Sequence, residues 1–291
     1  MSGGPIYLGG LAHSGKTPLR AALNAHPWIS ITRKTSPWTR FYGRFGDLTD
    51  RANLDRFLAA LVADDAVATL EPDAGRVRAE LADGPVSYAR LFGLLQAHHA
   101  ERQGCSRWGE QARSIERFAD PIFEAYPDAR MIHLIRDPRD GFGASPRRGP
   151  GTVGWHTAMW RRSAELAERN RGRYPRGYLA VRYEALVADP GVTLEQVCSF
   201  IDEACLPAMR EALLEGLHAK EVDLGTTPAQ RAFVDRYAGP ALPAFDYPAA
   251  TATVTNRDRV SFALASRPLN RATMAAWRLV EGRAGREPAG R

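Results

Sequence analysis

The feature that most constrains the fold of this chain is a phosphate-binding loop pattern near its start. Residues Gly10 to Thr17 read GLAHSGKT and match GxxxxGK[ST], between a short apolar run and a helix-like segment. Glycines in this pattern let the backbone curl so that several N–H groups point inward, while the helix N-terminus and Lys16 add positive charge. The alternative is a glycine-rich turn of no function, but that would leave the matching strand and helix unexplained. The pattern therefore predicts a strand, an anion-binding loop and a helix, and it indicates a protein that handles phosphate or sulfate.

Further apolar segments predict an α/β protein. Residues 130–135 (RMIHLI) and 178–183 (YLAVRY) are typical of strands, and helical periodicity occurs around residues 54–61, 88–100, 115–125 and 155–171. Strands that alternate with helices form a parallel sheet covered on both faces, so we expect a three-layer α/β fold with a mainly parallel sheet. We expect one domain over residues 1–281, and a flexible tail at 282–291, whose Gly, Pro and Arg cannot build a core.

Composition and charge narrow the choice of partners and compartment. The chain holds 39 Lys and Arg against 33 Asp and Glu, a net charge of +6 that favours anionic partners, unless it reflects a genome-wide preference for arginine codons. We expect no nucleic-acid partner, because zinc spacings, RNP-like aromatic motifs and dense basic runs are missing. Three widely spaced cysteines, no basic leader and no long apolar run predict a cytoplasmic protein with reduced thiols, no metal site and no membrane span.

A second anion site is expected where the strand at residues 130–135 ends. Ligands of parallel sheets bind beyond the carboxyl ends of the strands. Kinases and nucleotidases normally place an Asp there to hold magnesium. Here Arg136 comes first and Asp137 follows one position later, so the edge offers a guanidinium that can grip a phosphate with two N–H groups. The alternative is a surface ion pair between Arg136 and Asp137 or Asp140.

Taken together, these segments resemble the PAPS-dependent sulfotransferase family, from about Pro5 to at least Phe200. GLAHSGKTPLRAALNAHP resembles the family's 5′-phosphosulfate loop and first helix, and ARMIHLIRDPRDGFGAS resembles its strand and 3′-phosphate motif. RWGEQARSIERFADPIFEAYPDAR and YLAVRYEALVADPGVTLEQVCSFI are similar to two further segments of the family. The resemblance implies a P-loop-like α/β fold that binds 3′-phosphoadenosine 5′-phosphosulfate (PAPS), moves its sulfuryl group to an acceptor hydroxyl or amine, and releases adenosine 3′,5′-bisphosphate (PAP).

The resemblance also implies which residues hold the donor. The 5′-phosphosulfate would lie on His13, Ser14, Gly15, Lys16 and Thr17, and the 3′-phosphate on Arg136 and Ser145. The chain departs from the family in three places. His13 stands where relatives usually have Arg or Lys, and Lys16 where Thr is common. Ala144 occupies the position of the usual serine, with Ser145 after it, and residues 111–113 (QAR) replace a frequent KTP.

Sulfuryl transfer by in-line displacement needs a cation at the leaving oxygen and a base for the acceptor. Lys16 is the expected cation, and His13 can donate to the same oxygen when protonated or act as a base when neutral. Glu110 is a candidate general base or else a solvated or helix-capping carboxylate, and His156 is a second candidate. His133, in the middle of a predicted strand, is expected to be a hydrogen-bonded core residue.

The acceptor is expected to be a small or carbohydrate-like molecule whose identity the sequence does not give. Residues 36–48 (SPWTRFYGRFGDL) either cover the acceptor site or form a core-covering helix with arginines toward solvent. Residues 266–278 resemble a C-terminal segment of some relatives and either approach the nucleotide or serve for packing. The alternative functions are a P-loop ATP-dependent kinase or nucleotidase, favoured by Lys16 and Thr17, and a noncatalytic nucleotide or nucleic-acid binding module.

Overall fold

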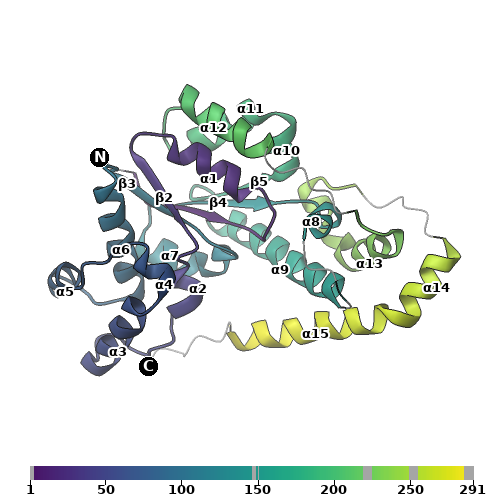
Figure 1. The fold of residues 1–291 in the computed structure, drawn as a ribbon, viewed down its shortest axis with the longest axis horizontal. Coiled ribbons are helices and arrows are strands. Elements are labelled where there is room, and N and C mark those ends of the chain that lie inside the picture. The colour runs from purple at the N-terminus through teal and green to yellow at the C-terminus, as the bar shows by residue number, and fades with distance from the viewer. Residues whose placement is uncertain (1–2, 146–148, 150, 219–224, 249–254, 285–291) are drawn as a thin grey trace.

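The centre of the computed structural model, which describes residues 3–145, 149, 151–218, 225–248 and 255–284, is a five-stranded parallel sheet (Figure 1). The strands are β1 (Ile6–Gly9), β2 (Ile29–Arg33), β3 (Arg107–Gln111), β4 (Arg130–Ile135) and β5 (Tyr178–Arg182). Their order across the sheet is β2-β3-β1-β4-β5, and each neighbouring pair runs parallel. All carboxyl ends therefore meet at one edge of the sheet, as ligand binding in α/β proteins requires.

Helices cover both faces of this sheet and confirm the expected three-layer arrangement (Figure 1). One face carries α1 (Lys16–Asn24), α10 (Tyr183–Ala188), α11 (Pro190–Phe200) and α12 (Pro207–His218). The other carries α6 (Tyr88–Arg102), α7 (Ala119–Ala125) and α9 (Thr152–Arg173). The remaining elements are α2 (Pro37–Phe41), α3 (Arg51–Val62), α4 (Asp65–Ala68), α5 (Ala74–Ala82), η1 (Ile115–Phe118), α8 (Pro138–Gly143), α13 (Pro228–Ala238), η2 (Gly239–Ala241), η3 (Pro243–Phe245), α14 (Asn256–Ala265) and α15 (Arg267–Ala284).

Alternate residues of the central strands enter two different cores. Ile6 and Leu8 of β1 pack with Leu19 and Leu23 of α1 on one face. Tyr7, between them in sequence, belongs to a core cluster on the opposite face. Because both faces are buried, the central strands read as nearly continuous apolar runs, which is why β1 and β4 are recognisable in the sequence.

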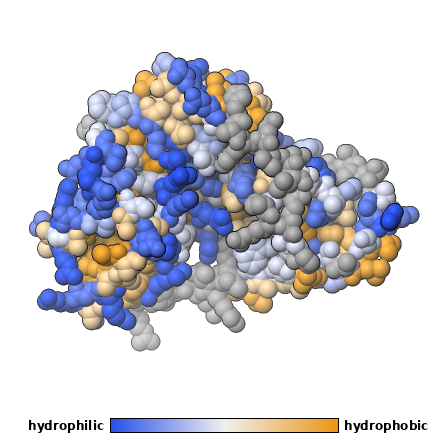
Figure 2. Space-filling model, in the orientation of Figure 1, coloured by the Kyte–Doolittle hydropathy of each residue, from blue (hydrophilic) through white to orange (hydrophobic). Residues whose placement is uncertain are grey.

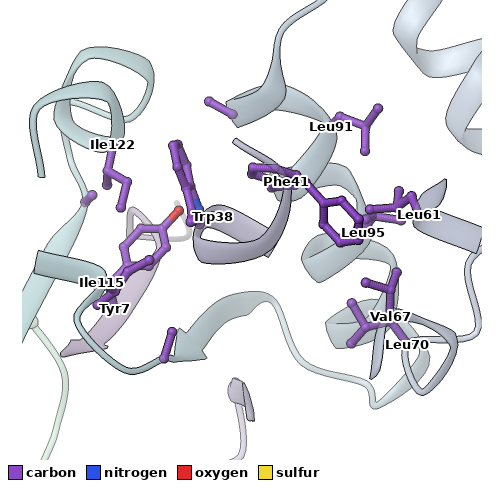
Figure 3. Close-up of a cluster of buried hydrophobic side chains, with 14 of the residues drawn as sticks. Tyr7, Trp38, Phe41, Leu61, Val67, Leu70, Leu91, Leu95, Ile115 and Ile122 are labelled. Carbon is purple, nitrogen blue, oxygen red and sulfur yellow. The ribbon is translucent and has the colours of Figure 1, made fainter. Parts of the chain in front are cut away.

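The aromatic segment at residues 36–48 lies in the second of these cores (Figure 3). Trp38 is 1% exposed and its ring packs 5.2 Å from that of Phe92, while Phe41 is 8% exposed. Arg40 faces outward and pairs with Asp64 at the surface. The buried rings of Trp38 and Phe41 therefore pack in the core, as the core-covering alternative expects.

The C-terminal helices extend away from the sheet (Figure 1). α15 lies so close to α9 that a Cβ atom at Gly154 would come within 1.9 Å of the Asn270 carbonyl oxygen. Hydrophobic residues gather at the end of the molecule formed by α13 and α14, where Val260 and Leu264 are exposed (Figure 2). No helix in the described part of the chain has both the length and the apolar character needed to cross a membrane.

The predicted domain boundary stays a prediction. Residues 282–284, which begin the expected flexible tail, form the end of α15. Residues 285–291 lie outside the described residues, so the structure says nothing about them.

Candidate active site

The phosphate loop curls as its pattern predicts, between β1 and α1. Gly10, His13 and Gly15 have φ angles of 110°, 63° and 89°, in the left-handed region. A Cβ atom at Gly10 would lie 2.2 Å from the Leu134 carbonyl oxygen, and one at Gly15 would lie 2.5 Å from the ring of Tyr183. Only glycine fits these two places without a shift of the neighbours. The loop is therefore held tightly against β4 and the start of α10.

Lys16 is turned into the loop and is only 7% exposed. Its Nζ donates to the Gly10 carbonyl oxygen at 2.7 Å and to the Leu11 carbonyl oxygen, and Ser14 Oγ also donates to Leu11. The ammonium group thus holds these carbonyl groups inward, and its charge lies inside the loop. This geometry makes Lys16 a brace of the loop as well as a source of positive potential. Thr17 is half-buried in the first turn of α1.

A buried carboxylate supports the loop from beneath. Glu116, in η1, is fully buried and accepts a hydrogen bond from the Gly10 N–H at 2.9 Å. Its other oxygen lies 3.2 Å from Ser163 Oγ, which lies 2.8 Å from His133 Nε2, while His133 Nδ1 lies 2.5 Å from the Tyr178 hydroxyl. Burial lowers the pKa of His133 and so favours the neutral ring, with which every member of this chain of hydrogen bonds can be satisfied. His133 is confirmed as a hydrogen-bonded core residue.

Arg136 lies at the tip of β4, next to the loop. Its Nη1 donates to the His13 carbonyl oxygen at 3.2 Å, and its guanidinium stacks 4.3 Å from the ring centre of Tyr183. Its Nε is buried and has no hydrogen-bond partner among the described residues. The guanidinium of Arg136 and the phosphate loop therefore border the same space, as the adjacency of β1 and β4 requires.

The carboxylates that follow β4 are engaged elsewhere. Asp137 caps α8 by accepting from the Arg139 N–H at 2.9 Å, and its carboxylate pairs with the Arg139 guanidinium at 2.5 Å. Asp140 lies 3.8 Å from Arg231. The alternative ion pair with Arg136 is therefore not formed. In the described parts of the chain, no three His, Cys, Asp or Glu residues are grouped as metal ligands.

A cavity of about 480 Å³ opens beside the loop. Its lining includes two of the residues predicted to bind the donor nucleotide, His13 and Ser145. Arg113 lines it too, together with Trp155 of α9 and Thr273 of α15. The ring of Trp155 makes an edge contact with that of Trp277, 6.0 Å away. The C-terminal helix therefore helps to enclose the cavity. In the sequence, only the resemblance of residues 266–278 to a segment of some relatives pointed to this arrangement.

The two candidate bases occupy different places. His156 lines the cavity, its Nε2 lies 3.2 Å from the Pro138 carbonyl oxygen, and burial lowers its pKa to about 4. Glu110 lies on β3, is 1% exposed, and is not among the lining residues of that cavity. Burial raises the pKa of Glu110 to about 8, against the weaker effect of Thr35, whose hydroxyl lies 3.4 Å from the carboxylate. Sequence reasoning had identified both residues but not their burial.

Buried polar atoms without partners gather around this edge of the sheet. Among the described residues they include Gln111 Oε1 at the end of β3, Arg136 Nε after β4 and Arg182 Nε at the end of β5. An unpaired buried polar group costs about 1–3 kcal/mol, so folded proteins satisfy nearly all of them. The two guanidinium N–H groups are donors that an anionic ligand would satisfy, whereas the Gln111 oxygen needs a donor.

Comparison with known protein families gives a match over most of the chain. The model of the sulfotransferase family matches residues 5–206, which include the loop, Glu110 and Arg136. No curated protein sequence matches the chain.

Solved structures offer distant likenesses. The sulfotransferase STF9 from Mycobacterium avium is 14% identical over 85% of this chain and 78% of its own, with a TM-score of 0.47. The sulfotransferase domain of the Synechococcus PCC 7002 olefin synthase is 18% identical over 90% and 94%, with a TM-score of 0.46. A sulfotransferase from Alicyclobacillus acidocaldarius is 14% identical over 84% and 94%, with a TM-score of 0.48. The family match over residues 5–206 is what assigns the chain, and it confirms the resemblance noted in the sequence. This chain belongs to the sulfotransferase family.

Proposed function

We propose that this chain transfers the sulfuryl group of PAPS to a hydroxyl or amine of a small or carbohydrate-like acceptor and releases PAP. The observation that supports this most is the contact of 3.2 Å between Arg136 Nη1 and the His13 carbonyl oxygen. It brings a guanidinium from β4 beside the anion-binding loop that follows β1. A donor with phosphate groups at both its 5′ and its 3′ positions needs two such neighbouring anion sites.

The proposed donor site uses the loop and the end of β4. The backbone N–H groups of residues 14–16 and the Thr17 hydroxyl hold the 5′-phosphosulfate, as curled loops at helix N-termini do for anions. Arg136 and Ser145 hold the 3′-phosphate, and the unpartnered Nε of Arg136 is a donor that such a ligand would satisfy. His13, exposed at the crest of the loop, faces the same cavity as Ser145.

The proposed reaction is an in-line displacement at sulfur. A bond forms between the acceptor oxygen or nitrogen and sulfur, the bond from sulfur to the bridging oxygen breaks, and the acceptor's proton passes to a base. Positioning and fixed positive charge supply most of the rate in such reactions. Lys16 contributes its positive charge from inside the loop, where its Nζ donates to the Gly10 and Leu11 carbonyl oxygens, and this charge would stabilise the developing charge on the leaving oxygen. His13 can donate a further hydrogen bond.

We propose Glu110 as the base. Its pKa of about 8 lies near the operating pH, where a carboxylate is a stronger proton acceptor than one with an ordinary pKa. His156, with a pKa of about 4, is a weaker acceptor of protons and suits a positioning role in the donor cavity. The proposal includes a metal-free reaction, since Asp137, the carboxylate after β4 that a kinase would need for magnesium, is bound to Arg139. It also includes a location in the cytoplasm.

Calorimetric titration separates this function from the alternatives. We expect metal-free PAP to bind at least about tenfold more tightly than ATP with magnesium, a difference of about 1.4 kcal/mol. Preference for ATP with magnesium would support a kinase or nucleotidase and contradict the proposal. Salt-dependent binding of nucleic acid, with neither nucleotide bound, would support a noncatalytic module.

A further inference from the structure

A second cavity lies along the outer edge of β2, outside the donor site. It has a volume of about 360 Å³ and is walled by Arg20 of α1, Arg33 of β2 and, from the side of α6, His99 and Gln103. β2 is the terminal strand of the sheet, next to the strand that carries Glu110. We call this cavity the β2 groove.

The described walls of the β2 groove carry two guanidinium groups and no carboxylate. Within the described part of the chain, neither Arg20 nor Arg33 forms an ion pair, and no carboxylate lines the groove. By contrast, Arg107, Arg130 and Arg139 each meet a carboxylate, at 2.8, 2.6 and 2.5 Å. Two guanidinium groups on one wall repel each other, which is a cost that a bound anion would remove.

Arg20 itself shows this cost. Burial, and then the charge of Arg33, lower the pKa of Arg20 below its ordinary value. Its Nε is buried without a partner, and its Nη1 makes only a long contact of 3.4 Å with the Ile31 carbonyl oxygen. The half-buried Arg20 guanidinium therefore keeps one buried N–H group without a partner at the wall of the groove, which leaves a donor for a ligand.

The groove does not fit an added β-strand. The Asn24 side chain accepts from the Ile31 N–H at 2.7 Å and donates to the Ile31 carbonyl oxygen at 3.1 Å. The open edge of β2 is thereby closed at its centre, a usual protection of edge strands. The groups left for a ligand are side-chain donors, chiefly the two guanidinium groups.

The position of the groove suits an acceptor. In the proposed function, the nucleotide lies over β1 and β4, so the acceptor of an in-line displacement arrives from the opposite side, over β3 and β2. Thr35 lines the groove, and its hydroxyl lies 3.4 Å from the Glu110 carboxylate. Arg20 follows Lys16 by about one helical turn, a rise of about 6 Å along α1. The groove thus runs from the neighbourhood of Glu110, the candidate base, along the outer edge of β2.

We propose that the β2 groove binds an oxyanion carried by the acceptor, so that the substrate is a hydroxylated or amino compound with a carboxylate, phosphate or sulfate group. Arg20 and Arg33 hold this group, because two N–H groups of a guanidinium can donate to two oxygens of a carboxylate, a phosphate or a sulfate. The inference rests on the proposed function for the role of the ligand, but anion binding in the groove does not depend on it.

The test uses three small probes and two double variants of the full chain. With PAP at saturation, phenyl phosphate, phenylacetate and neutral benzyl alcohol are titrated into wild type, R20Q/R33Q and R44Q/R56Q. The control pair removes the same charge from two exposed arginines outside the groove that form no ion pair in the described structure. We expect at least one anionic probe to bind R20Q/R33Q at least about tenfold more weakly than wild type and the control, since hydrogen bonds to charged groups are among the stronger ones.

Each outcome of this test has a separate meaning. A larger loss of affinity for phenyl phosphate in R20Q/R33Q indicates a tetrahedral phosphate or sulfate group, and a larger loss for phenylacetate indicates a carboxylate. Equal affinities of wild type and R20Q/R33Q for both anions, with both proteins folded by circular dichroism, would overturn the proposal. Failure of wild type to bind PAP would count against the proposed function alone, because the difference between the two double variants would still report on the groove.

Discussion

Two buried carboxylates, Glu116 beneath the phosphate loop and Glu110 at the end of β3, have nearly the same exposure and opposite surroundings. Glu116 accepts a hydrogen bond from the Gly10 N–H at 2.9 Å and belongs to a chain that runs through Ser163 and His133. Glu110 has a side-chain contact of 3.4 Å to Thr35, and burial raises its pKa to about 8. The fold supplies the hydrogen bonds that the Glu116 carboxylate needs. Glu110 instead has a raised pKa that serves no structural purpose.

This difference shows that one buried carboxylate can stabilise the fold while another is available for catalysis. A carboxylate that is fully hydrogen-bonded in a dry interior fixes the backbone around it, here the first turn of the loop. A buried carboxylate with few donors is costly when ionised, and such costs persist mainly where a site uses them. The comparison predicts that removing Glu116 damages the scaffold, whereas removing Glu110 spares it.

The largest effect is expected for Glu116→Gln. The amide keeps one acceptor but places an NH₂ group among donors, so we expect the free energy of unfolding to fall by about 3 kcal/mol. Urea unfolding measures it, and PAP affinity should fall as well because Gly10 loses its anchor. Glu124→Gln, a change of the same type at an exposed position of α7, is the control and should leave both unchanged. If Glu116→Gln unfolded at the same urea concentration as wild type, Glu116 would not support the scaffold, and the proposed difference between the two carboxylates would be contradicted.

A smaller effect with a distinct pH dependence is expected for Glu110→Gln. The folded pKa of about 8 lies above the ordinary value of 4.5, so the folded state holds this proton more firmly than the unfolded state. Wild type therefore loses stability as pH rises from about 5 to about 8, with a slope of at most about 1.4 kcal/mol per pH unit from this group. Glu110→Gln lacks that slope, so its stability relative to wild type rises by about 2 kcal/mol between pH 6 and pH 8. Parallel stability curves for the two proteins would refute the raised pKa.

The sequence was sufficient to predict those elements of the fold that follow one local sequence pattern. The loop, the helix after it and the strand at residues 130–135 occur where their patterns predict them. The sequence analysis predicted neither β2 nor β3. β3 carries Arg107 and Glu110 within five residues and therefore lacks an apolar signature. Arg107 is 3% exposed and pairs with Glu203 at 2.8 Å, a partner far away in sequence.

The candidate site was predictable in its outline but not in its contacts. Topology alone places Arg136 beside the loop, since neighbouring parallel strands end together. The inward turn of Lys16 onto the Gly10 carbonyl oxygen and the anchoring of the loop by Glu116 depend on distances between segments that no local pattern encodes. Helical periodicity includes Glu116 in a predicted helix and gives no sign of its role.

The central claim is that Arg136 and the phosphate loop bind opposite ends of one donor nucleotide. The most direct measurement compares the affinities of PAP and of 5′-AMP, which lacks the 3′-phosphate, for wild type and for Arg136→Ala. We expect wild type to prefer PAP by about 100-fold, or about 2.7 kcal/mol, and Arg136→Ala to lose most of this preference while its affinity for 5′-AMP changes little. If Arg136→Ala kept the wild-type preference for PAP, Arg136 would not hold the 3′-phosphate and the account would be contradicted.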